Sequence, residues 1–150
     1  MITTDLDTIF LHSKPMRLID AVIKLDPDYI HCHIEISADN IFYDKTINGI
    51  YAWVGMEYMA QAVAAYAGSH KEQVEPSLGL LLSVRTFKTS QPYFKVGQEL
   101  LVIANKEYIY DMVGVFNCEI IVDDVLVSSA KLSTIEPPPN KIEAILKGQK

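Results

Sequence analysis

The one long helical segment of this chain lies among strands, and this limits the folds that the chain can adopt. Residues 52–70 contain no proline, are rich in Ala, Met and Glu, and end near Gly68, which predicts a helix. Most of the remaining sequence alternates apolar and polar residues between turn signals, as strands do. An antiparallel sheet has to bury one face, and only this helix can cover it. We therefore expect a single α+β domain, with an antiparallel sheet wrapped around one long central helix.

The strands are predicted from alternation and from the turns between them. Residues 15–36 form two runs around the Asp-Pro-Asp turn, and in the second run His31, His33 and Glu35 point away from the apolar side chains. Four longer strands are expected after the helix, in residues 78–90, 98–110, 113–123 and 125–137. The segments between these four strands are short enough for a continuous antiparallel meander. The domain is expected to span residues 1–150, with about 138–150 as a C-terminal tail that is either a short helix or frayed.

Charge and hydropathy exclude several classes of protein. The net charge is −6 and the Lys and Arg residues are not clustered, which disfavours a nucleic-acid partner. No apolar run approaches the roughly 20 residues of a membrane span. The segment Met1–Phe10 has two acids and no basic region, so it does not predict a signal peptide. We expect a cytoplasmic protein without a membrane span.

The cysteines and histidines do not form a recognisable metal site. Cys32 and Cys118 lie in alternating runs and are expected to be buried free thiols rather than a disulfide. His31 and His33 share the polar face of one strand, but no third ligand lies near them in sequence. The sequence also has no glycine-rich phosphate loop. No cofactor and no metal are therefore expected.

Glu57 is the unusual residue of the helix. It lies on one narrow stripe with Gln61, Ala64 and Gly68, flanked by Ala60 and Ala65. The rest of the helix is apolar, so we expect the whole helix to be buried. An ionised carboxylate without partners would cost several kcal/mol in such a place. Either Glu57 reaches the surface or caps a neighbouring backbone group, or it belongs to a functional site.

Several segments resemble one known family. The stretch "EYMAQAVAAYAG" (57–68) resembles the Glu-Ala-Met-Ala-Gln helix of the 3-hydroxyacyl-acyl-carrier-protein dehydratases, and "FLHSKPMRLID" (10–20) resembles their N-terminal segment. The dehydratase-like subunits of aryl polyene biosynthesis are more similar, through "YAWVGMEYMAQ", "GLLLSVRTFKTSQPYFKVGQEL", "GVFNCEI" and "SSAKLSTIEP". The resemblance covers about Leu11 to Pro137. It implies a hotdog fold and a lyase of fatty-acid or polyene-type acyl chain synthesis.

The resemblance also implies roles for individual residues. Glu57 corresponds to the catalytic acid, which protonates the departing hydroxyl of a 3-hydroxyacyl thioester while a histidine takes the α-proton. A backbone N–H near Gly55 would polarise the thioester carbonyl. The position of the family's histidine falls on Tyr43, or on Asn40 if the loop is shifted, and neither is a histidine. Gln61, Trp53 and Phe42 are the side chains predicted to contact the substrate. The aromatic residues either line its pocket or pack in the core: Phe42, Tyr43, Trp53 and Tyr58.

Three functions remain open at this stage. The first is a dehydratase acting on an acyl chain linked to an acyl carrier protein or to CoA, either complete in itself or sharing its base across a homodimer or a heterodimer with a paralogue. The second is a hotdog thioesterase in which Glu57 activates water or attacks the acyl group. The third is a non-catalytic structural subunit. In the first case we expect Glu57 at a dimer interface beside an apolar tunnel. The cations that could dock a carrier protein are Lys14, Arg17, Arg85, Lys88 and Lys95.

Overall fold

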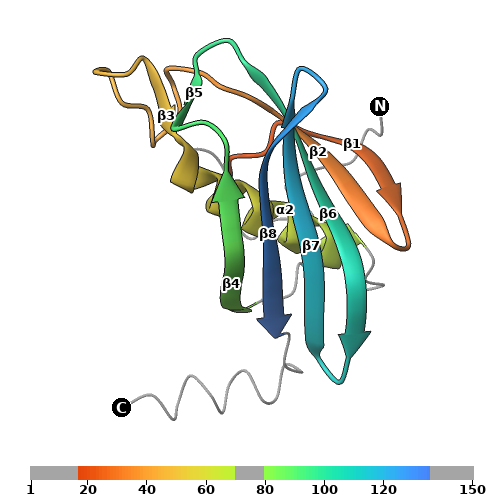
Figure 1. Cartoon of the computed structure of the whole chain (residues 1–150). Helices are drawn as coiled ribbons and strands as arrows, with labels where there is room; N and C mark the ends of the chain where they lie inside the picture. Colours follow the sequence, from red (N-terminus) through yellow and green to blue (C-terminus); the bar gives the residue numbers. More distant parts are fainter. Residues whose placement is uncertain (1–16, 70–79, 136–150) are drawn as a thin grey trace, which may run out of the picture.

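The computed structural model describes residues 17–69 and 80–135, which form a curved sheet and one long helix (Figure 1). The sheet strands are β1 (Ala21–Asp26), β2 (Tyr29–Glu35), β4 (Leu80–Thr89), β6 (Glu99–Tyr110), β7 (Val113–Val122) and β8 (Val125–Ile135). Two short strands, β3 (Gly49–Tyr51) and β5 (Tyr93–Lys95), pair with each other. A 3₁₀ turn, η1 (Ala52–Val54), leads directly into the helix α2 (Gly55–Ser69).

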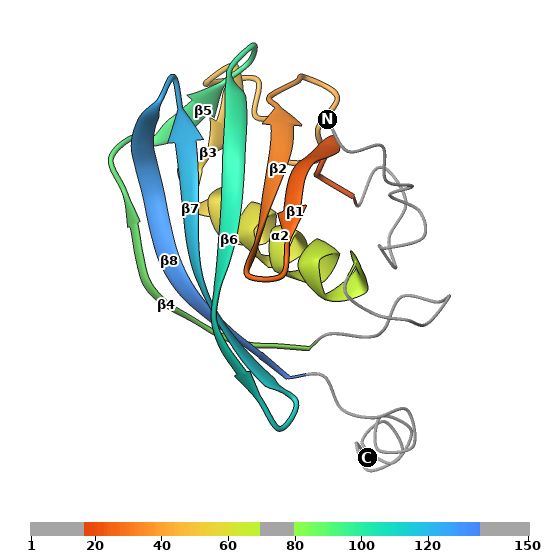
Figure 2. The same ribbon diagram turned by 90° about the vertical axis from the view of Figure 1, so that its right-hand side faces the viewer.

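The six-stranded sheet is antiparallel and wraps around α2. Its strand order is β1-β2-β6-β7-β8-β4, and the side view shows the helix lying in the hollow of the curved sheet (Figure 2). The α+β architecture predicted from the sequence is therefore confirmed. The tail predicted at about 138–150 lies outside the described residues.

The continuous meander predicted for the last four strands is wrong at its first step. Strand β4 pairs with β8 at the edge of the sheet and not with β6. The segment between β4 and β6, predicted as a turn, contains β5 and crosses the start of the helix. Its ends are held on both sides: the Ser90 N–H donates to the Val127 carbonyl, and the Ala52 N–H donates to the Pro92 carbonyl. This crossover places residues 90–95 beside the start of the helix.

The remaining turns follow the sequence prediction. Strands β6 and β7 are joined by Asp111 and Met112, and β7 and β8 by Asp123 and Asp124. All four residues have positive φ, as the two-residue hairpin turns that suit twisted strands require.

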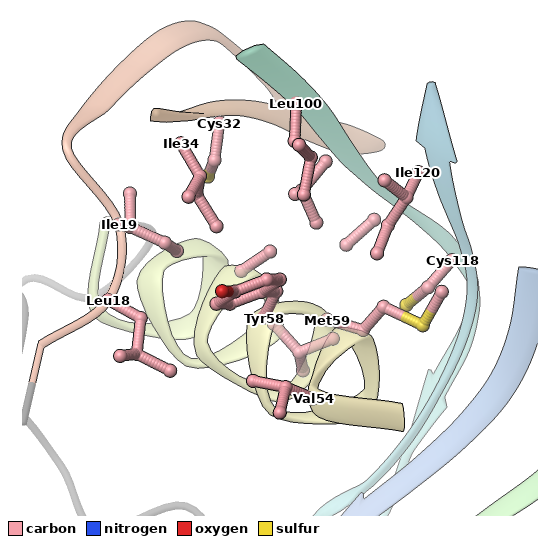
Figure 3. Packing of buried hydrophobic residues seen from close by; sticks show 14 of the residues in the cluster. Leu18, Ile19, Cys32, Ile34, Val54, Tyr58, Met59, Leu100, Cys118 and Ile120 are labelled. Carbon is pink, nitrogen blue, oxygen red and sulfur yellow. The ribbon is translucent and has the colours of Figure 1, made fainter. Parts of the chain in front are cut away.

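The core lies between the sheet and one face of α2 (Figure 3). Tyr58 packs against Phe94 with ring centroids 6.4 Å apart, and Tyr66 packs edge-on against Phe116 at 5.3 Å. Gly55 comes so close to β7 that an added Cβ would lie 2.9 Å from Ile120 Cδ1. The buried helix residues are Gly55, Tyr58, Met59, Ala62, Val63, Ala65 and Tyr66.

Both cysteines belong to this core and are free thiols, as predicted. Burial raises the pKa of Cys32 to about 12 and that of Cys118 to about 12. On β2, Ile30, Cys32 and Ile34 are fully buried. The predicted alternation of this strand is therefore confirmed.

Candidate functional site

Glu57 lies in the first turn of α2 and is exposed in this chain. Ala64 is also exposed, and Gln61 and Gly68 are half-buried, so the predicted stripe is observed. Ala65, which flanks this stripe on the side toward the sheet, is fully buried. The expectation that the whole helix is buried is wrong for the stripe. A carboxylate in the first helical turn is favoured by the helix dipole, and in the single chain it needs no buried partner.

Gln61 anchors the segment that precedes β1. Its Oε1 accepts a hydrogen bond from the Leu18 N–H at 2.7 Å. Leu18 and Ile19 are buried in the core next to the helix. The amide oxygen of Gln61 thus satisfies a backbone donor of its own chain, and contact with a substrate stays a prediction.

Asn40 and Tyr43 both hold the loop that leads to the helix. Asn40 Oδ1 accepts from the Phe42 N–H at 2.8 Å, and the Asn40 carbonyl accepts from the Tyr43 N–H at 3.0 Å. The Tyr43 hydroxyl donates to Asn48 Oδ1 at 2.8 Å. Both side chains therefore form hydrogen bonds within the loop. Their proposed part in catalysis is untested.

A group of apolar side chains stands open to solvent where the helix begins. Trp53 is 53% exposed and meets Phe42 edge-on, with ring centroids 6.0 Å apart. Ile41 is 44% exposed and Tyr51 is 39% exposed. We refer to Ile41, Phe42, Tyr51 and Trp53 as the helix-start patch. Ile41 and Tyr51 are not identified from the sequence. Large apolar residues within the polar stretch 37–51 could have indicated an exposed apolar surface.

Gly55 lies next to the helix-start patch and is buried. Its N–H donates to the Ala52 carbonyl within the turn of η1. This donor is therefore already paired in the single chain. Whether an N–H near Gly55 polarises a thioester stays a prediction.

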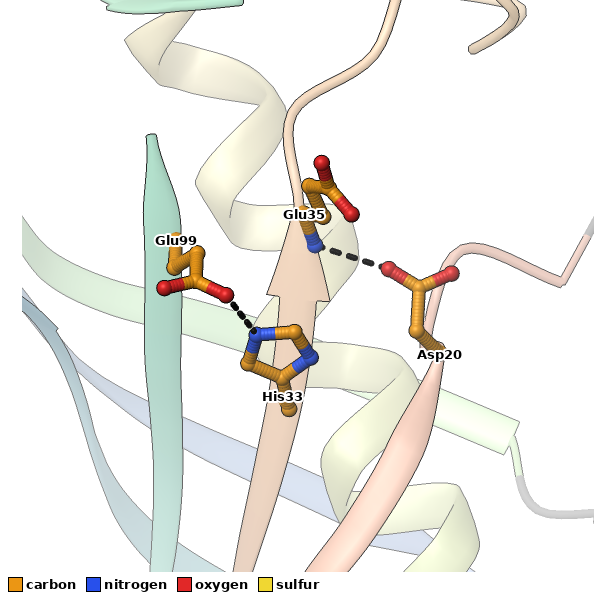
Figure 4. Close-up of polar contacts among 4 residues, drawn as sticks. All are labelled: Asp20, His33, Glu35 and Glu99. Carbon is orange, nitrogen blue, oxygen red and sulfur yellow. Dashed lines mark hydrogen bonds and ion pairs between the residues drawn. The ribbon is translucent and has the colours of Figure 1, made fainter. Parts of the chain in front are cut away.

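The described histidines lie on the outer face of the sheet, away from the helix. His33 Nε2 is 3.3 Å from Glu99 Oε1, and nearby the Glu35 N–H donates to Asp20 Oδ2 at 2.7 Å (Figure 4). Burial lowers the pKa of His31, with a smaller contribution from Lys24. Within residues 17–69 and 80–135, no group of three or more His, Cys, Asp or Glu is placed to hold a metal ion. Neither described histidine can act together with Glu57 in the same chain.

The cations suggested for carrier-protein docking are not brought together at the start of the helix. Arg85 and Lys88 lie on β4 at the sheet edge, and Lys95 lies on β5. Lys14 is outside the described residues. In the part of the chain that the structure describes, no helix is long and apolar enough to cross a membrane.

Comparisons with known proteins place the chain in a family. The model of the ApeP-like family, described as ApeP dehydratase, matches residues 4–147. The dehydratase heterocomplex ApeI:P from Xenorhabdus doucetiae has a similar structure, with a TM-score of 0.88 and 24% identity over 97% of this chain and 99% of that chain. No curated protein sequence matches significantly.

Two further solved structures share the fold at low identity. The PaaI protein of E. coli, from the phenylacetic acid degradation operon, has a TM-score of 0.60 and 15% identity over 77% of this chain and 81% of that chain. A hypothetical thioesterase from Streptococcus pneumoniae, solved with coenzyme A, has a TM-score of 0.63 and 9% identity over 77% and 86%. These likenesses support the fold alone. With its hotdog architecture and a family match over nearly its whole length, the chain belongs to the ApeP-like dehydratase family.

Proposed function

We propose that this chain is one subunit of a 3-hydroxyacyl-thioester dehydratase, that Glu57 is its catalytic acid, and that another chain supplies the base. Family membership supports dehydratase-like chemistry in polyene-type acyl chain synthesis. The observation that carries the division of labour is the exposed Glu57 on α2, with Asn40 and Tyr43 both bonded within their own loop. The acid is open to a second chain, and the positions expected for the base hold no histidine.

The reaction needs two groups, one on each side of the substrate. A base removes a proton from the carbon next to the thioester carbonyl, and the electron pair forms the new carbon–carbon double bond. The Glu57 carboxyl donates its proton to the departing hydroxyl, which leaves as water. The proton taken by the base later returns to Glu57 through solvent, so the site needs no cofactor. Gln61, Trp53 and Phe42 are the proposed substrate contacts.

The helix-start patch supports assembly with a second chain. Exposed Trp and Tyr side chains are typical of the centre of protein interfaces, and Trp53 stands one turn before Glu57. The similar structure from Xenorhabdus doucetiae is a dehydratase heterocomplex. We therefore favour a heterodimer with a histidine-bearing hotdog paralogue over a homodimer. Acyl chains linked to a carrier protein or to CoA are the proposed substrates, and the cytoplasm is the proposed location.

The test is reconstitution with a defined substrate. The full chain is incubated alone, with a histidine-bearing hotdog paralogue, and as Glu57→Gln with the same paralogue. Each mixture receives a 3-hydroxyacyl carrier protein, and loss of water is followed by mass spectrometry. Glu35→Gln serves as the matched control, because Glu35 is an exposed acid on the opposite side of the sheet.

Water loss that needs both chains and is abolished only by Glu57→Gln supports the proposal. Full activity of the Glu57→Gln mixture would show that this chain is a structural subunit. Release of free acid would identify a thioesterase, the alternative that the shared fold with thioesterase-like proteins keeps open.

A further inference from the structure

An extra residue in β4 brings two cations to the same face of the sheet. Arg85 lies opposite Lys131 on β8, and Lys88 lies opposite Ser129. Three residue steps on β4 thus match two on β8, which makes this irregularity a β-bulge. In a regular strand, residues three apart point to opposite faces. The bulge instead places Arg85 and Lys88 on one face.

Thr86 adopts the backbone conformation of this bulge. Its φ is 55°, which is a strained conformation for a β-branched residue. The next residue, Phe87, packs against the core, and Lys88 therefore points away from the core. Bulges often re-aim a side chain near a functional site, and strained residues gather at such sites.

The two cations meet a third on the outer face of the sheet, away from α2. Lys131 stands between Ala130 and Leu132, which are both buried in the core, so its own side chain points outward. Strand β4 is the edge strand and lies next to β8 (Figure 1). We call Arg85, Lys88 and Lys131 the cation cluster.

The cation cluster borders an open hollow of about 420 Å³. Lys88 and Lys131 line it, together with three neutral side chains that can donate hydrogen bonds: Asn105, Asn117 and Ser129. A second hollow, of about 260 Å³, shares Lys88 and Ser129 with the first. Cations and neutral donors around one hollow fit an anion with several acceptor oxygens, such as a phosphate group.

The charges around the hollow are not balanced. Lys131 Nζ is 3.2 Å from Glu107 Oε1, whereas Arg85 and Lys88 have no ionic partner among the described residues. Glu119 is the one acid among the residues that line the hollow. Three cations thus meet two acids, although the chain as a whole carries a net charge of −6. A bound anion would supply the missing negative charge.

We propose that the cation cluster binds the phosphate group of a phosphorylated small molecule. Arg85, Lys88 and Lys131 are the charged contacts, and Ser129 and Asn117 donate further hydrogen bonds. Two sources share this chemistry: free inorganic phosphates and phosphate esters such as CoA. The site lies on the face of the sheet opposite to α2, so it does not depend on the proposed dehydratase reaction.

Calorimetric titration of the full chain at low ionic strength tests this site, with inorganic pyrophosphate and CoA as separate probes. Lys88→Gln should raise the Kd about fivefold, which corresponds to one close charge contact in water. Glu119→Gln should lower the Kd, because it removes a carboxylate that repels the anion. Lys45→Gln is the matched control, because Lys45 is exposed in the loop before α2 and its loss changes the net charge equally.

Opposite shifts for Lys88→Gln and Glu119→Gln, with an unchanged Kd for Lys45→Gln, support the proposal, and the probe that binds more tightly identifies the source of the phosphate. Binding that Lys88→Gln leaves unchanged would place the probe elsewhere and would overturn the proposal. Equal losses in Lys88→Gln and Lys45→Gln would reduce the effect to overall charge and would overturn it too, as would the failure of both probes to bind. The titrations involve no turnover, so failure here is distinct from failure of the dehydratase proposal.

Discussion

The two faces of helix α2 lie in opposite environments. Toward the sheet, Tyr58, Met59 and Ala62 are fully buried. On the other face, Glu57 and Ala64 are exposed, as is Trp53 in the η1 turn before the helix. Apolar composition therefore shows that a surface is to be covered, but it does not show whether the cover comes from the same chain. The sheet covers one face, and the second is exposed in the single chain.

The helix residues that stabilise the domain therefore differ from those proposed to act in catalysis and assembly. Full burial of a large apolar side chain contributes roughly 1.5–3 kcal/mol, so the sheet-facing side chains hold the domain together. The open face contributes little to the stability of the single chain. Substitutions on the first face should change unfolding, and substitutions on the second should change catalysis and assembly.

The largest effect is expected for Glu57→Gln on the open face. Loss of the proton donor should lower kcat of the reconstituted complex by about 10²–10⁴-fold. The melting temperature of the chain should stay unchanged, because Glu57 is exposed and the amide is nearly isosteric. Steady-state kinetics and calorimetry on the same preparation measure both quantities. A large loss of stability would place Glu57 in the structural framework instead.

The counterpart on the sheet-facing side is Met59→Ala. Met59 is fully buried, and its truncation should lower the free energy of unfolding by about 3 kcal/mol, as other core truncations to Ala do. Met56→Ala is the matched control, since Met56 is only half-buried and should cost clearly less. Urea denaturation of both variants gives the comparison. Equal costs would show that the two faces do not differ in packing as the structure indicates.

Trp53→Ala tests the open face as an interface. Truncation of a central aromatic at an interface typically costs about 2 kcal/mol, or roughly 30-fold in Kd for the paralogue. The single chain should keep its stability, because Trp53 is more than half exposed. Val125→Ser, at an exposed apolar position of the β7–β8 hairpin, should leave Kd unchanged. Sedimentation or calorimetric titration measures the Kd of both variants. A tight complex with Trp53→Ala would show that the helix-start patch is not part of the interface.

The two buried thiols should make the stability of the domain depend on pH. Burial raises the pKa of Cys32 and Cys118 to about 12 from an ordinary value of 9. Below pH 9 the thiols are protonated in both states, and this contribution to stability is fully present. Above pH 9 the unfolded chain loses these protons first, so stability falls as pH rises toward 12, by roughly 1 kcal/mol per thiol at pH 10. Denaturation of the Cys32→Ala/Cys118→Ala variant should show a shallower alkaline decline, and an identical slope would contradict the assignment.

The sequence was sufficient for those elements whose partners are local or periodic. The alternation of β2 predicted which side chains are buried, and the Asp-rich turns predicted two hairpins, because both signals depend on neighbouring residues. The pairing of β4 with β8 was missed, because β5 interrupts the segment between β4 and β6 and no local pattern distinguishes a crossover from a turn. Whether a strand lies at the edge of a sheet depends on how all the strands pair.

The site shows the same division. The helical stripe with Glu57 and Gln61 followed from helical geometry alone. The sequence left open whether Glu57 is exposed, because helical geometry does not show which face of the helix the sheet covers. The hydrogen bonds of Asn40 and Tyr43 within their loop also depend on a fold that spacing does not reveal. A sequence shows which side chains share a face, and the tertiary structure decides what that face meets.

The smallest effect is expected at Gln61, which lies between the two faces. Its Oε1 accepts the Leu18 N–H, and removal of this acceptor by Gln61→Leu should cost about 1 kcal/mol of stability. Gln61→Glu keeps an acceptor at the same position and should keep most of that stability. If Gln61 also contacts the substrate, Gln61→Glu will raise KM of the reconstituted complex while the fold stays intact. If both stability and KM are unchanged in Gln61→Glu, Gln61 is a structural anchor and not a substrate contact.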